Sequence, residues 1–454
     1  MEKTDGLPLI DRRWAMLTIA LAITMSTLDS TIANVALPTI ARDLNSTPNS
    51  SIWVINAYQL TLSICLLPLS SLGDIVGYRK VYCAGLAIFS AASLACAISS
   101  SLPALTLARV LQGIGAAGIL SVNAAIIRLI YPKKELGRGI GLNAFIVAVS
   151  AALGPTIAAG ILAIGTWEWL FAINVPIGLV ALRIATTHLP DSHNGYTFDW
   201  ANAVLCAMTI SILIISIDGV GHQGKLIQVA SGLLFAFGMG VVLIRRELTV
   251  EAPLFPVDLF KIPLFASSIA TSICSFIAQM AAFTSLPFFM QYVLLRNEVQ
   301  TGLLMTPWPI ATAITAPLAG RLADRYSVGV LGGIGLLIFS AGLYLLAGLS
   351  ADATDASIMW RMSICGAGFG LFQSPNNRAI LGSAPDNRSG SASGMLGTAR
   401  LLGQTVGAAL VSLVFGLVAA GPTRIVLYGA AILSIVAACV SMIRIGPRYR
   451  LSNE

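Results

Sequence analysis

Apolar runs of about 20 residues alternate with short polar connections along almost the whole chain. A run of this length predicts a membrane-spanning α-helix, because about 20 residues at ~1.5 Å each cross the ~30 Å hydrocarbon core of a bilayer. Fourteen such runs can be placed, and they begin near Trp14, Ser51, Val81, Ala104, Ile140, Leu170, Trp200, Leu226, Phe265, Thr301, Val328, Ile358, Gly394 and Arg424. The expected fold class is therefore all-α integral membrane, with fourteen transmembrane helices.

The Lys and Arg residues are distributed unevenly between the two sides of these helices. With the N-terminus in the cytoplasm, 20 of the 27 lie on the cytoplasmic side, four (Arg42, Lys225, Arg296 and Arg424) lie outside, and three lie within the runs. Cytoplasmic loops of membrane proteins carry an excess of Lys and Arg. We therefore expect a multi-pass protein of the cell inner (plasma) membrane with both termini cytoplasmic, since an even number of helices returns the chain to its starting side.

The composition agrees with this topology. Hydrophobic residues make up 56% of the chain and charged residues only 10%, whereas a soluble domain has about 25% charged residues. The net charge of +7 is then a topology signal, and no nucleic-acid partner is expected. The seven Cys lie in apolar runs without a CxxC pair, so we expect no metal and no cofactor. Because the chain has no P-loop, no paired acids and no metal-ligand cluster, we expect neither an enzyme nor direct use of ATP.

The chain also repeats part of itself. Three short matches occur in the same order at offsets of 250, 252 and 249, namely residues 72–74 with 322–324, Arg109 with Arg361, and residues 153–156 with 402–405. Both copies keep the same orientation, which indicates a parallel repeat of six helices with helices 7 and 8 as an inserted pair. The expected domains are an N-terminal six-helix half at residues 1–190, the inserted pair at 191–260 and a C-terminal six-helix half at 261–454.

Asp29 is the only carboxylate well inside an apolar run. An ionised carboxylate at the centre of a membrane helix costs roughly 2.5–3.5 kcal/mol, and such residues usually mark a functional site. By helix rise, Asp29 lies roughly 22 Å from the cytoplasmic surface and Arg109 about 9 Å below the outer surface, so we expect the two to pair. Asp29 is then either the group that takes and releases a coupled proton, with Arg109 setting its pKa, or a structural acid.

Five motifs carry a resemblance to a known family. They are residues 28–38, 70–80, 109–116, 167–178 and 320–325. Together they resemble the signatures of the fourteen-helix drug:proton antiporters of the major facilitator superfamily. The resemblance extends over most of the chain. It implies two six-helix halves around a central cavity, and transport by alternating access as the halves rock about that cavity.

The resemblance assigns roles to some motif residues. The loop after the second helix and its copy in the second half form a conformational motif of Asp74, Gly77, Arg79, Lys80, Gly320, Asp324 and Arg325. Asp74 is expected to cap a helix or to pair with a basic residue in one transport state. The alternative is a surface turn whose Arg79 and Lys80 reach the lipid head groups. Gly154 and Pro155 resemble the antiporter motif, which bends a helix between the halves, and the alternative is an ordinary proline kink.

Polar or aromatic residues on the inner helices are candidates to line a substrate cavity. They are Asn34, Tyr58, Gln59, Asn143, Gln279, Phe283, Gln373, Asn376 and Arg400. Each of them could instead be a packing residue. Arg400 lies close to the expected midplane, where it could bond to backbone carbonyls, reach Asp29 or meet an anionic group of the substrate.

These observations predict a proton-coupled secondary transporter that exports amphiphilic drugs or toxic compounds and works as a monomer. Since Asp29 is the one intramembrane acid, we favour monocationic, neutral or amphiphilic substrates over dications, which need more countercharge. The alternative is a proton-coupled transporter of the same fold with a narrow physiological substrate, such as a metabolite or a siderophore.

Overall fold

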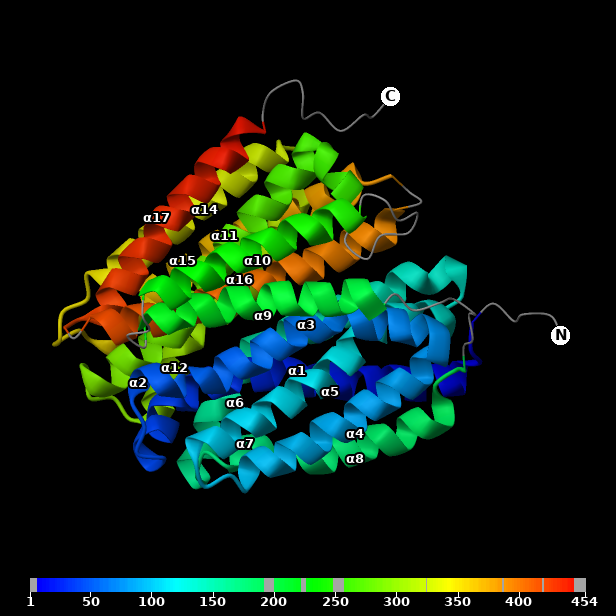
Figure 1. Ribbon diagram of the computed structural model, residues 1–454, viewed down its shortest axis with the longest axis horizontal. Helices are drawn as coiled ribbons and strands as arrows, with labels where there is room; N and C mark the ends of the chain where they lie inside the picture. Colours follow the sequence, from blue (N-terminus) through cyan, green and yellow to red (C-terminus); the bar gives the residue numbers. More distant parts are fainter. Residues whose placement is uncertain are drawn as a thin grey trace. The chain divides into compact units, whose positions relative to one another are not determined.

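The computed structural model describes residues 6–191, 200–221, 226–247, 257–323, 325–385, 388–418 and 420–444. Throughout these ranges the ordered elements are helices and no β-strand occurs (Figure 1). The α-helices are α1 Leu9–Asp43, α2 Pro48–Ser51, α3 Trp53–Val76, α4 Tyr78–Ala97, α5 Leu102–Ile130, α6 Leu136–Ile164, α7 Trp169–Ala172, α8 Asn174–His188, α9 Trp200–Gly221, α10 Leu226–Glu247, α11 Pro263–Tyr292, α12 Glu298–Met305, α13 Pro307–Leu322, α14 Val328–Ala347, α15 Asp355–Ser383, α16 Ser389–Leu417 and α17 Pro422–Ile443. The expected all-α class is confirmed.

The helices reproduce the predicted fourteen segments when three broken pairs, α2 with α3, α7 with α8 and α12 with α13, each count as one. Nine of the described helices are long and apolar enough to cross a membrane on their own. A tenth span, from residue 48 to residue 76, is bent by 47° before Pro68. The bend follows from the missing N–H of proline and from the clash of its ring with the preceding turn.

The first of two compact units comprises Met1–Ser46 and Trp53–Ala207. Its helix pairs are α1 with α6 and α8, α4 with α5 and α8, and α3 with α5. Small residues bring some of these backbones close together. A Cβ added at Gly115 in α5 would overlap the backbone of Phe89 in α4. Glycine therefore sets the distance between these two helices, as small residues commonly do between membrane helices.

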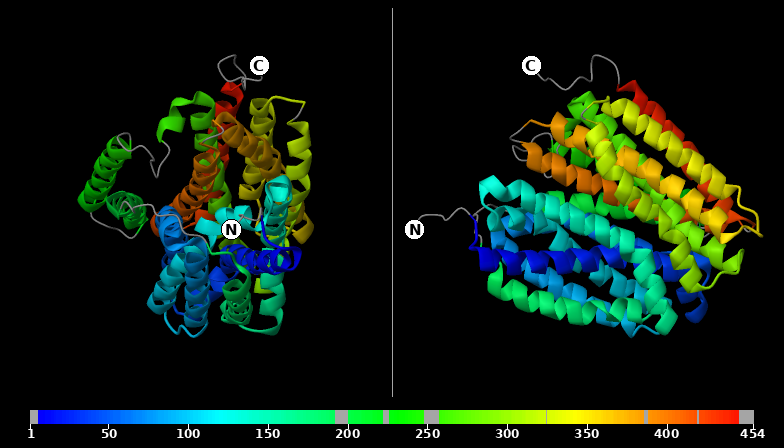
Figure 2. Two further views of the ribbon diagram at one scale, coloured as in Figure 1. Left: turned by 90° about the vertical axis from the view of Figure 1, so that its right-hand side faces the viewer. Right: turned by 180° about the vertical axis from the view of Figure 1, so that it is seen from behind.

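The second unit comprises Thr47–Ile52 and Met208–Glu454. Its helix pairs are α11 with α16 and α17, α14 with α15 and α17, and α13 with α15, and α14, α15 and α17 lie side by side (Figure 2). Each pair has a counterpart in the first unit, in the same chain order. A Cβ added at Gly368 would likewise overlap the backbone of Phe339, as at Gly115 and Phe89. The internal repeat is thus visible in the packing.

The inserted pair occurs as two helices of 22 residues, α9 and α10, which begin at the predicted positions. They approach each other at Gly232, where a Cβ would overlap the hydroxyl of Ser216. The boundary between the two units lies within α9, after Ala207. The three-part division of the chain at residues 190 and 260 stays a prediction.

Candidate functional site

The centre of the candidate site is a buried ion pair inside the first unit. Asp29 comes from α1 and Arg109 from α5, and they are 2% and 1% exposed. The Nη1 of Arg109 donates a hydrogen bond to Oδ2 of Asp29. The pairing expected from their depths is therefore confirmed, while the role of the pair in proton coupling stays a prediction.

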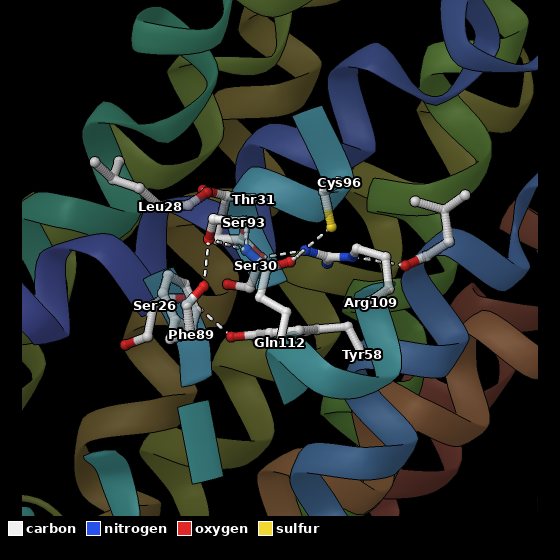
Figure 3. Close-up of polar contacts among 12 residues, drawn as sticks. Ser26, Leu28, Ser30, Thr31, Tyr58, Phe89, Ser93, Cys96, Arg109 and Gln112 are labelled. Atoms are coloured by element: carbon white, nitrogen blue, oxygen red, sulfur yellow. Dashed lines mark hydrogen bonds and ion pairs between the residues drawn. The ribbon is translucent and has the colours of Figure 1, made fainter. Parts of the chain in front are cut away.

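Gln112, one turn after Arg109 on α5, completes the pair. Its Nε2 donates to Oδ1 of Asp29 at 2.9 Å and to the hydroxyl of Ser93 at 2.9 Å. Its Oε1 accepts from Arg109 at 2.6 Å and from the thiol of Cys96 at 3.5 Å (Figure 3). Sequence reasoning did not assign a role to Gln112. Its spacing of three residues from Arg109 was the available signal, since residues three apart share a helix face.

Arg109 has three further contacts besides Asp29 and Gln112. Its Nε donates to the backbone carbonyl of Val54 in α3 at 2.9 Å. Its guanidinium carbon lies 4.3 Å from the ring centroid of Tyr58 and 5.5 Å from that of Phe171. Both distances are within the range of cation–π attraction. The cation is thus held by one carboxylate, two neutral oxygens and two aromatic rings.

This arrangement explains how a charged pair can be buried. Removing two charges from water is repaid only when their geometry is good and their other hydrogen-bonding groups are satisfied. Both oxygens of Asp29 accept hydrogen bonds, one from Arg109 and one from Gln112. Chemically, Asp29 is a carboxyl group that can exchange a proton, and a change in its charge directly changes its bond to Arg109.

The conformational motif lies between α3 and α4. Gly77 has a φ of +106°, a conformation that favours glycine, and it allows the tight turn there. The hydroxyl of Tyr78 donates to Asp74. Arg79 donates to the carbonyl of Thr186 near the end of α8 and lies 3.0 Å from Asp191, while Lys80 is exposed. Arg79 therefore ties the start of α4 to the end of α8, and the proposed switching role stays a prediction.

The second copy of this motif is only partly described. Gly320 lies in the last turns of α13, and a Cβ added there would lie 3.1 Å from the hydroxyl of Ser374 in α15. Arg325 is exposed. Asp324 lies outside the described residues, so the structure gives no contact for it.

Gly154 and Pro155 lie inside α6, where it packs against α1. A Cβ added at Gly154 would overlap the hydroxyl of Thr31, two residues after Asp29. Gly154 is thus a close-approach position between the two helices. A bend at Pro155 that serves transport remains a prediction.

A cavity of about 200 Å³ lies between α1 and α6 in the first unit. Its lining includes Thr24, Leu28, Phe145, Val149, Ser150 and Leu153. The hydroxyl of Ser150 donates to that of Thr24 at 3.1 Å, and the rest of the lining is apolar. None of these residues was among the predicted cavity residues. Only the facing of two helices brings them together, and the sequence does not specify that facing.

The predicted cavity residues of the first unit have several surroundings. Tyr58 is 1% exposed, packs against Arg109 and donates to the carbonyl of Ser26 at 3.3 Å. Asn34 and Gln59 are each 2% exposed, and Asn143 accepts from Asn123 at 3.0 Å. Tyr58 therefore belongs to the ion-pair site. The proposed contact of all four with substrate stays a prediction.

Those of the second unit are also dispersed. The ring of Phe283 lies edge-on to Trp308 at 4.9 Å. Asn376 is buried and accepts from Arg444 at 2.8 Å. Gln279, Gln373 and Arg400 are half-buried, in that order on α11, α15 and α16. The alternatives for Arg400 stay open as predictions.

The glycine contacts correct one match in the internal repeat. A Cβ at Gly113 would lie 2.7 Å from the carbonyl oxygen of Tyr58, and one at Gly366 would overlap that of Trp308. These two glycines are 253 residues apart, which makes Met362 the counterpart of Arg109. The sequence match of Arg109 with Arg361 is therefore wrong by one residue.

Arg361 has a different environment from Arg109. It donates to the carbonyl of Ser357 on its own helix at 3.2 Å, and its guanidinium lies 4.8 Å from the ring of Trp360. Met362, which is fully buried, occupies the position equivalent to the cation. The buried ion pair of the first unit is thus not repeated at this position.

A metal site would require acidic, His or Cys side chains that lie close together. In the part of the chain with described coordinates, no group of three or more such residues could hold a metal ion. The chemistry of the candidate site is therefore that of a carboxyl, a guanidinium, an amide and two aromatic rings.

Comparison with known proteins places this geometry in a family. The sequence model of the Major Facilitator Superfamily matches residues 19–408 and 270–452. The chain is 55% identical to "Uncharacterized transporter YebQ" of Escherichia coli (strain K12), over 99% of both chains. It is 29% identical to the riboflavin transporter RibZ of Clostridioides difficile (strain 630), over 89% of this chain and 88% of that one.

More distant relatives agree in fold. The chain is 29% identical to the multidrug resistance protein Stp of Mycobacterium tuberculosis (strain CDC 1551 / Oshkosh), over 87% of this chain and 74% of that one. A crystal structure of a bacterial homologue of the human lysosomal transporter Spinster superposes with a TM-score of 0.71 at 16% identity, over 99% of this chain and all of that one. These likenesses identify a multi-pass membrane transporter rather than an enzyme. The chain belongs to the Major Facilitator Superfamily.

Proposed function

We propose that this protein is a proton-coupled antiporter that exports amphiphilic drugs or toxic compounds by alternating access. The observation that carries the proposal is the fully buried pair of Asp29 and Arg109, with Gln112 bound to both. A buried carboxylate inside a membrane helix is costly to maintain, and such groups in transporters usually bind ions or protons.

In this proposal Asp29 takes up a proton from the outer side and releases it to the cytoplasm. Ionised Asp29 accepts from Arg109 and Gln112, and protonation removes the negative charge that attracts the guanidinium. The change in that attraction biases the two halves between their transport states. The turn at Gly77, with Asp74 and Arg79, is proposed to stabilise one of those states.

The proposed substrates are monocationic, neutral or amphiphilic compounds. The cavity between α1 and α6 supports this class, because its lining is apolar except for the hydroxyls of Thr24 and Ser150. It suits an apolar group that carries one hydrogen-bonding atom. The relative Stp is named as a multidrug resistance protein, which supports the same substrate class.

A second candidate is a transporter of one physiological compound, such as a metabolite or a siderophore. The observation in its favour is the relative RibZ, which is named as a riboflavin transporter and matches over most of its length. The mechanism at Asp29 is the same in both candidates. They differ in the number of compounds that drive proton movement.

The proposal includes the setting of the protein. It lies in the inner (plasma) membrane with both termini in the cytoplasm and works as a monomer. The excess of Lys and Arg in the loops assigned to the cytoplasm supports this orientation.

Proteoliposomes with an acidic lumen test the proposal. Lumenal pH is recorded while monocationic, dicationic, neutral and anionic compounds are added, with Asp29→Asn measured in parallel. Proton efflux with several unrelated compounds, absent in the variant, is the expected result. A response to one compound alone favours the narrow-substrate candidate, and proton exchange that persists in Asp29→Asn contradicts the role of Asp29.

A further inference from the structure

The segment from Trp167 to Phe171 contacts the ion-pair site, although its sequence contains no group that could carry a proton to Asp29. Trp167 lies in the turn before α7, and Phe171 lies within α7. Their side chains are 2% and 1% exposed. Two large aromatic rings are therefore buried at a helix break inside the first unit, where a simple connection between helices does not require them.

The contacts of these rings lead to Arg109. The edge of one ring faces the other between Trp167 and Phe171, with centroids 6.2 Å apart and planes at 82°. The ring of Phe171 lies 5.5 Å from the guanidinium carbon of Arg109, and that of Tyr58 lies 4.3 Å from it. Edge-to-face packing fixes the position of an aromatic ring. Trp167 thus supports Phe171, and Phe171 and Tyr58 together contact the cation.

We propose that Phe171, supported by Trp167, is a positioning residue that keeps the guanidinium of Arg109 beside Asp29 whether that carboxyl is charged or protonated. The inference rests on the proposed function, because it assigns to this segment the control of the pH at which Asp29 exchanges its proton.

The physical reason lies in what Arg109 retains after Asp29 is protonated. With Asp29 charged, the ion pair alone keeps the guanidinium in place. With Asp29 neutral, the remaining partners are the carbonyl of Val54, the amide oxygen of Gln112 and the two rings. The attraction of a cation to an aromatic face does not depend on the charge of Asp29. The rings therefore prevent Arg109 from moving to other acceptors when the proton arrives.

Replacing the ring of Phe171 changes the balance in one direction. Without it, Arg109 can relax away from a protonated Asp29, and this relaxation is not available while the ion pair exists. The protonated state is favoured, and the midpoint of Asp29 titration moves to higher pH. The loss of one desolvated cation–π contact corresponds to a shift of about one pH unit.

The experiment measures protonation of Asp29 directly, in the purified full-length protein. Infrared difference spectra are recorded against pH, and the carboxylic acid band of Asp29 is identified by its absence in Asp29→Asn. Phe171→Leu removes the ring and keeps an apolar side chain, and Phe171→Tyr keeps the ring. Phe171→Met replaces the leucine variant if that one does not fold. The same proteins are then measured for drug-driven proton efflux.

The expected result is a higher midpoint in Phe171→Leu and a midpoint close to that of the unmodified protein in Phe171→Tyr. An unchanged midpoint in folded Phe171→Leu overturns the inference, even if transport is slower, since a packing role alone lowers the rate without moving the titration. A shifted midpoint without a response to any compound supports the inference and counts against the proposed function. Drug-driven efflux that depends on Asp29, with no shift in Phe171→Leu, supports the proposed function and overturns the inference.

Discussion

The contact between α1 and α6 gives a sharp test of the packing next to the candidate site. A Cβ at Gly154 would overlap the hydroxyl of Thr31 and lie 2.8 Å from its Cβ. Gly160 lies six residues later on the same helix, and a Cβ added there has no other atom within 4 Å. Gly154→Ala and Gly160→Ala therefore introduce the same methyl group into the same helix, one in a contact and one in open space.

The expected magnitudes follow from these surroundings. Alanine in place of glycine within a helix is worth about 0.5–1 kcal/mol of stabilisation. At Gly160 this gain is unopposed. At Gly154 the added methyl forces Thr31 or the helix to move, and overpacking of this kind costs about 1–3 kcal/mol. We expect Gly154→Ala to be less stable than Gly160→Ala by about 1–3 kcal/mol.

The assay is thermal unfolding of the purified protein in detergent, read by exposure of buried thiols such as Cys96 and Cys365. Thr31→Ala removes the overlapping hydroxyl, so combining it with Gly154→Ala should recover part of the loss, and the double-mutant cycle gives the coupling between the two positions. Equal melting of Gly154→Ala and Gly160→Ala, or no coupling to Thr31, would refute the assignment of Gly154 as a close-approach position.

Other contacts give further predictions. Gln112→Leu removes donors and acceptors from Asp29 and Arg109, so we expect a loss of about 2–3 kcal/mol, measured by the same melting assay; melting unchanged from the unmodified protein would contradict it. Arg109→Lys keeps the charge but not the planar set of donors, so proton exchange should fall at least tenfold in proteoliposomes, and exchange at the original rate would show that charge alone is sufficient. Asp191→Ala removes an exposed partner of Arg79 and should change stability by less than ~1 kcal/mol, which a larger drop in melting temperature would disprove.

The ion pair was predictable from the sequence, whereas its surroundings were not. A carboxylate in an apolar run is conspicuous because its burial is costly, and helix rise alone puts Arg109 at a matching depth. Gln112 and Phe171 carry no such signal. A neutral amide or a ring in a membrane helix is compatible with many positions, and their role depends on which helix faces meet.

The mistaken match of Arg109 with Arg361 has a geometric origin. An arginine one residue out of register points about 100° away around the helix, because a helix has 3.6 residues per turn. Similar residue types at a similar offset therefore do not show that two side chains occupy equivalent places. The backbone contacts of Gly113 and Gly366 settle the register, since they depend on the paths of the helices.

The paired glycine contacts also separate framework from chemistry. Gly115 against Phe89 and Gly368 against Phe339 hold two helix pairs together through backbone atoms, in two copies of one arrangement. Because backbone proximity sets the frame, the side chains within it can differ without altering the paths of the helices. One copy holds a charged arginine where the other holds the thioether of Met362. A duplicated frame of this kind lets one copy specialise while the other keeps its shape.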